Sequence, residues 1–302
     1  MANTIALAEQ YLPLLDRIYK KAATSAVLES NGNLIKNSTM NADTVYIPKI
    51  TLQGLADYAR NTGYTSGDVT FEYQSHTFSQ ERGRKFSVDR FDDIETQNQA
   101  FGALAGEFIR TMVVPEVDAY RYATMYEKAG TTEEADLTNS TVDAAIEAGI
   151  VVLDEAEVPR EDRILFVTPT VKSLIRRSDA YVRNLNAVTG GGINTEFDTY
   201  NGMRVVTVPQ GRFYTAITQR DGTTGGQEAG GYIKNAGTGK NLNFMIADAK
   251  AVMAIVKTAR PKIISPEANQ DADAYIFGYR LYHDLFVPDN KVDGIYAHNA
   301  TT

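Results

Sequence analysis

The carboxylates of Asp92, Asp93 and Glu95 lie close enough in the sequence to act together. Such a group could hold a metal ion or share acid–base chemistry in a hydrolase. No histidine lies near them in the sequence to complete a metal site. Carboxylates at the start of a helix also accept bonds from its free N–H groups and complement its dipole. We therefore interpret the three residues as a helix start, with a hydrolase as the weakest functional alternative.

The remaining candidates for chemistry are isolated. None of the three histidines has a partner at the spacing of metal ligands, and we expect surface or strand-face positions for them: His76, His283 and His298. Asp271 and Asp273 begin like a calcium loop, but Tyr275 occupies the next ligand position. The sequence contains no cysteine, which excludes disulfides and thiolate chemistry. These patterns predict neither an enzyme nor a bound metal or cofactor.

Glycine-rich segments could in principle hold a phosphate group. They occur at Gln53–Gly67, Thr189–Gly192 and Asp221–Gly239. None contains the phosphate-loop pattern or opens a recognisable dinucleotide-binding unit. We interpret the first as a flexible loop tip and the other two as mobile loops.

Charge limits the possible partners. The 302 residues include 30 basic and 38 acidic side chains, a formal charge of −8. This balance argues against tight binding to nucleic-acid phosphates. Four cations nevertheless cluster at Arg82, Arg84, Lys85 and Arg90, close to Glu81, Asp89, Asp92 and Asp93. Local ion pairing is the simpler interpretation, and a charged contact between subunits is the alternative.

Composition is that of an ordinary globular protein, with 43% hydrophobic and 23% charged residues. The first residues lack the basic and apolar regions of a secretory signal. No apolar run approaches the roughly 20 residues that span a bilayer. We expect no membrane partner.

The elements around the candidate residues form an extended arm followed by a long helix. The runs Thr44–Ile50 and Asp68–Ser79 alternate apolar and polar residues, as in strands with one buried face. A third strand is expected over Arg84–Phe91 at the base of this arm. The helix that follows meets Pro115, which predicts one bent helix or two helices end to end.

Other elements flank this unit. Apolar spacing predicts a helix over 5–28, followed by a polar linker. Ser140 with Asp143 resembles a capping box for a helix over Thr141–Glu155. A buried strand is expected at Arg163–Val167, followed by a helix over Thr170–Arg177 that Thr168 caps and Pro169 opens. Further regular stretches are Met203–Val208, Phe244–Ala247, Ala251–Lys257 and Tyr275–Val287, the last largely strand.

The order of these parts resembles the major capsid proteins of tailed bacteriophages, which share the Hong Kong 97-type fold. The resemblance rests on the Val-x-Ile-Pro-x-Ile run within Thr44–Ile50, the glycine-rich tip, and the segments Gly67–Phe71 and Arg82–Asp89. Near the end of the chain, Tyr282–Val287 and Asn290–Tyr296 are similar to the closing strands of such proteins. The resemblance extends over nearly the whole chain.

The resemblance implies an α+β fold in five parts. These are an N-terminal arm (1–43), an extended β-hairpin loop with its base strand (44–91), a spine helix with part of a peripheral domain (92–139), an axial domain (140–245) and C-terminal strands that return to the peripheral domain (246–302). It implies a head protein that self-assembles into an icosahedral shell around double-stranded DNA. An encapsulin-like shell is the closest alternative. The expected contacts between subunits involve Leu55, Tyr58, Arg60, Tyr64, Arg82, Arg84, Lys85 and Arg90.

The implied partners are other copies of the chain in hexamers and pentamers, a separate scaffolding protein, a portal protein, and packaged DNA without sequence-specific contact. The expected location is the virion, with assembly in the host cytoplasm. We expect no covalent cross-links, because the tip Gln53–Gly67 contains no lysine. We also expect no trimming, because only one helix and a linker precede Thr44.

Overall fold

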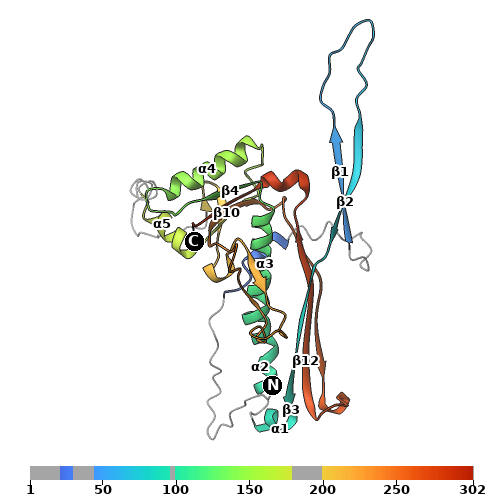
Figure 1. Ribbon diagram of the computed structural model, residues 1–302, viewed down its shortest axis with the longest axis vertical. Coiled ribbons are helices and arrows are strands. Elements are labelled where there is room, and N and C mark those ends of the chain that lie inside the picture. The colour runs from blue at the N-terminus through green and yellow to red at the C-terminus, as the bar shows by residue number, and fades with distance from the viewer. Residues whose placement is uncertain (1–20, 30–43, 96–98, 179–198, 302) are drawn as a thin grey trace, which may run out of the picture.

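The computed structural model describes residues 21–29, 44–95, 99–178 and 199–301. They form an elongated molecule around a central column of helix (Figure 1). A larger sheet with two helices lies at one end of this column, and a long, narrow sheet runs beside it. A two-stranded arm projects beyond the rest of the molecule. Most of the predicted helix 5–28, its linker and the predicted loop Thr189–Gly192 lie outside the described residues.

The helical column consists of α1 (Arg90–Glu95), α2 (Gln99–Phe108), a π-helical turn (Ile109–Val113) and α3 (Val114–Glu127). In the π turn the N–H of Val114 donates to the carbonyl of Ile109, five residues earlier. Pro115 follows directly, in the first turn of α3. A proline lacks an N–H and clashes with the preceding turn, and the wider π turn accommodates it. The helix therefore continues through Pro115, where we predicted one bent helix or two helices end to end, and does not divide into two there.

The larger sheet has six strands in the order β4-β13-β10-β5-β7-β6. The strands are β4 (Thr131–Glu134), β5 (Arg163–Val167), β6 (Thr199–Tyr200), β7 (Met203–Thr207), β10 (Leu242–Asp248) and β13 (Ile295–Asn299). Parallel pairing joins β13 to β4 and β5 to β7, and the other neighbours are antiparallel. This sheet draws strands from three of the predicted segments, and the predicted segment boundaries remain a prediction.

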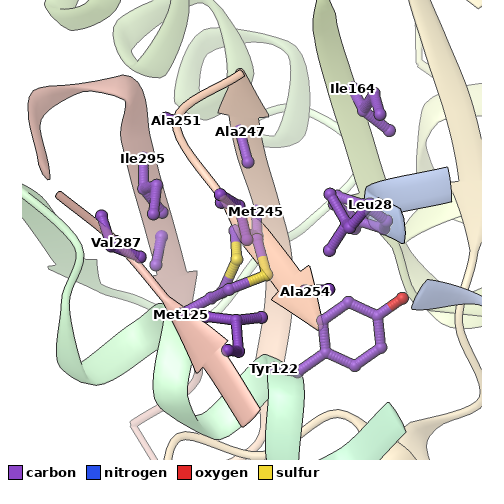
Figure 2. Close-up of a cluster of buried hydrophobic side chains, with 14 of the residues drawn as sticks. Leu28, Tyr122, Met125, Ile164, Met245, Ala247, Ala251, Ala254, Val287 and Ile295 are labelled. Carbon is purple, nitrogen blue, oxygen red and sulfur yellow. The ribbon is translucent and has the colours of Figure 1, made fainter. Parts of the chain in front are cut away.

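Both faces of the larger sheet are covered. Along β5, Leu165 and Val167 pack with the helices α4 (Val142–Glu155) and α5 (Pro169–Arg176). The alternate residues Ile164 and Phe166 belong to the core on the other face, which α3 covers. Figure 2 shows this second core, where Tyr122 and Met125 of α3 meet Met245 and Leu28. A strand buried on both faces requires a continuous apolar run, which explains why the sequence predicted β5 correctly.

The narrow sheet is antiparallel, in the order β11-β12-β3, and consists of β11 (Met253–Ile264), β12 (Ala274–Phe286) and β3 (Gln80–Asp89). Phe108 of α2 packs edge-on against Phe86 and Phe277 on one of its faces. Two further strands, β8 (Ile217–Gln219) and β9 (Tyr232–Lys234), form a separate hairpin. The segment Asp221–Gly239, predicted as a mobile loop throughout, therefore includes a strand.

Helix starts gave mixed results. The Thr168 side chain accepts a bond from the N–H of Val171, as predicted, and α5 begins at Pro169. The capping box at Ser140 was wrong: Thr141 precedes α4 without a side-chain cap, and Asp143 accepts a bond from the Tyr200 hydroxyl. The two residues meet only in the folded chain, so local spacing could not reveal the competing bond.

The predicted helix 5–28 was wrong in its described part. Residues 21–24 are not helical, and residues 25–29 form a short 3₁₀ turn. The backbone N–H groups of Thr24 and Ser25 donate to the carboxylate of Asp118 in α3, at 2.9 and 3.0 Å. These N–H groups therefore bond to a distant side chain and not to a preceding turn of helix.

Candidate interaction surface

The arm consists of β1 (Thr44–Leu52) and β2 (Val69–Thr77), an isolated antiparallel pair. Its register runs from Thr44 opposite Thr77 to Leu52 opposite Val69. Figure 1 shows the pair leaving the body of the molecule near the start of β3. The prediction of a two-stranded arm is confirmed.

One face of the arm is apolar and uncovered. Opposite residues of an antiparallel pair share a face, and the pairs Ile50 with Phe71 and Leu52 with Val69 lie on the same one. These four side chains are 53–64% exposed. Pro48 and the exposed rings of Tyr46 and Tyr73 continue this apolar face toward the base, as the register shows. The alternation predicted a buried face, but within a single chain this face is not buried.

The tip of the arm exposes further apolar side chains. Leu55 and Tyr64 are 107% and 90% exposed, and the ring of Tyr58 lies edge-on 4.9 Å from that of Tyr64. Gly63 has a φ of 83°, which favours glycine, and its N–H closes a turn on Ala59. Arg60 lies at this turn, also exposed. The tip therefore presents aromatic and aliphatic groups that its own chain leaves uncovered.

The base of the arm is anchored to the narrow sheet. Val45 and Phe78 are buried with Met253, Ile255 and Phe286 in a small apolar cluster. Beside it, Lys49 Nζ lies 3.3 Å from Asp289 Oδ2, and Gln74 also bonds to Asp289. The arm is thus fixed at one end and free along most of its length.

A buried carboxylate ties this base to the helical column. Asp284 of β12 accepts bonds from the N–H of Ser79 at 2.7 Å and from the hydroxyl of Tyr120 in α3 at 2.6 Å. Burial, and then the bond to Asp284, raise the pKa of Tyr120 to about 12. This phenol therefore remains a neutral donor at physiological pH.

The basic cluster bonds to residues distant in the chain. Arg82 forms an ion pair with Glu116 at 2.6 Å and donates to the Arg220 carbonyl. Arg84 donates to the carbonyls of Glu228 and Ala229. The two arginines thus hold the loop between β8 and β9 against β3.

The other two cations of the cluster are Arg90 and Lys85. Arg90 lies 3.8 Å from Glu267 and 3.9 Å from Asp273, and Lys85 is exposed. Ion pairs form as expected, but these partners differ from the predicted ones.

Two of the three carboxylates, Asp92 and Asp93, belong to the start of a helix. Asp93 is only 4% exposed, and Asp92 lies with it in the first turn of α1. The cap comes one residue before α1, where Asp89 accepts a bond from the N–H of Phe91. The side chain of Glu95 lies outside the described residues. Among the residues that the structure describes, no three or more His, Cys, Asp or Glu side chains are arranged to hold a metal ion.

The histidines lie on strand faces but not on the surface. His283 and His298 are 2% and 0% exposed, on β12 and β13. Burial lowers the pKa of both, that of His283 to about 4. His76 on β2 is partly buried, and burial lowers its pKa as well.

None of the helices in the described part of the chain is long and apolar enough to cross a bilayer.

Sequence reasoning missed Asp118, which organises a buried polar network. Its carboxylate accepts bonds from the backbone and hydroxyls of Thr24 and Ser25 and from Arg212 at 2.9 Å. Arg121, one turn along α3, bonds to Ser25 and Glu29. The network fixes the segment 21–29 against α3. The partners lie more than 90 residues away, and no local pattern indicates them.

Comparison with solved structures identifies the fold. The capsid structure of cyanophage P-SCSP1u matches with a TM-score of 0.64 at 14% identity, over 98% of this chain and 93% of that one. The asymmetric unit of the bacteriophage PhiM1 mature capsid matches with a TM-score of 0.64 at 12% identity, over 98% and 92%. Gordonia phage Cozz matches with a TM-score of 0.66 at 14% identity, over 98% and 92%. No family model and no curated protein sequence matches the chain. The chain therefore has the α+β fold of phage capsid structures, as predicted.

Proposed function

We propose that the chain is the major capsid protein of a tailed bacteriophage and assembles with itself into an icosahedral shell around double-stranded DNA. The observation that carries this proposal is the apolar face of the arm. Ile50, Leu52, Val69 and Phe71 are all more than half exposed on a hairpin that projects from the subunit. A contiguous exposed apolar face on a soluble protein indicates a surface that another protein covers.

The arm suits assembly because a neighbouring subunit can cover the apolar face that its own chain leaves exposed. A hairpin of two strands is marginally stable by itself in water, so contacts with a neighbouring subunit stabilise both the arm and the assembly. Each contact is weak, but many repeated contacts in a closed shell add up. We place Leu55, Tyr58, Arg60 and Tyr64 of the tip in these contacts.

The basic residues have a more limited role in this proposal. Arg82 and Arg84 hold the loop between β8 and β9, so any contact with a neighbour would add to existing bonds. Lys85 and Arg90 are exposed and remain candidates for contact between subunits.

The proposed partners are further copies in hexamers and pentamers, a separate scaffolding protein, a portal protein and packaged DNA. The formal charge of −8 suits a lining that does not bind DNA phosphates tightly. The protein would act in the virion after assembly in the host cytoplasm, as a structural subunit without catalysis. Among the residues that the structure describes, no feature favours an encapsulin-like shell or a hydrolase.

Expression with and without its neighbouring phage gene products tests the proposal. Light scattering and electron microscopy should show uniform icosahedral particles, and particles from infected cells should contain double-stranded DNA. Particles that enclose protein cargo and no genome would indicate an encapsulin-like shell. A chain that stays monomeric under every condition would contradict a capsid role.

A further inference from the structure

The narrow sheet has one covered face and one open face. Phe86, Phe277 and Tyr279 point toward α2, where Phe108 packs against them. The alternating residues point to the opposite side, which we call the open face. Near the arm this side is covered by the cluster of Val45 and Phe78. Farther along β3, β11 and β12 it is exposed.

Four cations dominate the exposed part of the open face, and all are exposed: Lys85, Arg260, Lys262 and Arg280. They occupy two neighbouring rows across the sheet. In one row Gly278 lies between Lys85 and Lys262, and in the next Arg280 lies opposite Arg260. These two rows contain no carboxylate. Glu81, in the next row, bonds to Arg280. A chain of charge −8 thus carries a local positive surface.

This arrangement is unfavourable for the isolated chain. Like charges directly opposite each other on neighbouring strands destabilise a sheet, and Arg260 faces Arg280 in this way. Within the described ranges, Lys85, Arg260 and Lys262 form no ion pair. An anionic partner would relieve this repulsion.

A glycine lies in the middle of these cations without a structural requirement for it. A Cβ on Gly278 would touch only Lys262, at 3.8 Å or more, and its φ lies outside the left-handed region. By contrast, a Cβ on Gly83 would meet the carbonyl oxygen of Tyr279 at 2.8 Å. A glycine inside a strand often marks a place where a ligand or another backbone approaches closely. Gly278 leaves a shallow floor between Lys85 and Lys262.

The size and surroundings of the surface favour a protein partner over DNA. A duplex carries a charge about every 1.7 Å and extends far beyond two rows of a sheet. It would then meet the carboxylates at the end of the sheet, such as Glu267 and Asp273, and a chain that is acidic overall. The arm of a second copy is a poor match because its apolar face carries no charge and its other face pairs Lys49 with Glu72.

We propose that the open face is a docking site for an acidic segment of a different protein, with a carboxylate placed above Gly278 between Lys85 and Lys262. The contact is sequence-tolerant and sensitive to salt, because exposed charges form it. It does not depend on shell formation, since the face belongs to a single chain.

Binding of a fluorescent decapeptide of glutamate and serine to the purified full-length chain tests this proposal. The triple variant Lys85→Gln, Arg260→Gln, Lys262→Gln should bind the peptide more weakly, by up to about tenfold. This is the loss expected for three exposed charge contacts. The matched control Lys128→Gln, Lys234→Gln, Lys291→Gln removes three cations elsewhere and should bind as the wild type does. Circular dichroism and thermal unfolding confirm that each variant is folded.

A second pair of variants tests the close approach at Gly278. Gly278→Leu keeps every cation but fills the floor, and should weaken peptide binding severalfold, whereas Gly278→Ala should not. Unchanged binding by Gly278→Leu, or equal loss in both triple variants, would overturn the proposal. The proposal would also be overturned if a short DNA duplex displaced the peptide when its phosphates were less concentrated than the carboxylates of the peptide. Self-association of the chain that only the first triple variant abolishes would assign the face to a second copy instead.

Discussion

Gln74 and Asp289 bond to each other twice across a separation of 215 residues in the chain. The Gln74 amide donates to Asp289 Oδ1 at 2.5 Å, and the backbone N–H of Asp289 donates to Gln74 Oε1 at 3.2 Å. Lys49 approaches the other carboxylate oxygen at 3.3 Å. Gln74 thus attaches β2 of the arm to the turn that follows β12.

Gln74→Ala should loosen the arm without unfolding the subunit. The bonds are exposed, so the free energy of unfolding should fall by about 1 kcal/mol or less. Amide hydrogen exchange in β1 and β2 should accelerate, because the anchor is lost. Thr70→Ala lies farther out on the same strand and serves as the control. Equal exchange rates in the wild type and Gln74→Ala would show that the apolar cluster alone anchors the arm.

Gly149→Ala should destabilise the subunit although alanine favours helix. A Cβ at this position in α4 would lie 2.7 Å from the ring of Tyr296, which is fully buried. Overpacking of this kind costs about 1–3 kcal/mol. In Gly106→Ala of α2 the new Cβ meets nothing within 4 Å, so this control should be neutral or stabilising. Chemical denaturation measures both, and equal stability of the two variants would contradict the prediction.

The parts of the fold that the sequence predicted well are those that neighbouring residues determine. Within Arg163–Val167 the four residues after the arginine are apolar because the strand is buried on both faces, and Thr168 and Pro169 start the next helix by local bonds. The arm followed from alternation in Val69, Phe71 and Tyr73. Alternation identifies a strand but does not say which molecule covers its apolar face. The exposure of this face therefore required the structure.

Bonds between distant residues account for the failures. The local pattern places Thr24 and Ser25 in a helix, but in the folded chain their N–H groups donate to Asp118. The cations on β3 and β11 form one surface only after the narrow sheet is assembled, so the net charge alone concealed it. Tertiary context overrides local propensity in both cases.

Asp118→Ala should be among the most destabilising single changes in the described part of the chain. It removes the carboxylate that pairs with Arg212, which is 4% exposed, and leaves two buried N–H groups without their acceptor. Removal of one partner from a buried ion pair costs about 3–5 kcal/mol. Asp143→Ala loses one part-buried bond to Tyr200 and should cost about 1 kcal/mol. Urea unfolding compares the two, and a cost of Asp118→Ala no larger than that of the control would contradict the prediction.

Acidification should destabilise the subunit partly through His283. Burial lowers its pKa from 6.5 to about 4 in the folded chain. Between these values the unfolded chain binds a proton that the folded chain does not. Stability is therefore fully present above pH 6.5 and falls as the pH approaches 4. The loss from this residue alone reaches about 3 kcal/mol at most.

Comparison of wild type and His283→Gln at neutral and mildly acidic pH isolates this effect. Both proteins lose stability as carboxylates titrate, but the variant should lose less between the two conditions. NMR of the imidazole provides an independent measurement, and His283 should remain neutral at a pH where a free histidine is charged. A charged imidazole there, or an equal loss in both proteins, would be inconsistent with its burial as a neutral group.

The apolar face of the arm should matter for assembly and little for folding. Ile50 and Phe71 lie opposite each other and are 53% and 58% exposed, so Ile50→Ser with Phe71→Ser removes contacts that the isolated chain barely makes. The free energy of unfolding should change by about 0.5 kcal/mol or less, whereas the yield of particles should fall severely. Thr51→Ser with Thr70→Ser alters the pair on the opposite face and should leave assembly intact. Sedimentation of assembly reactions measures particle yield, and normal particles from the first double variant would mean that this face is not what joins the subunits.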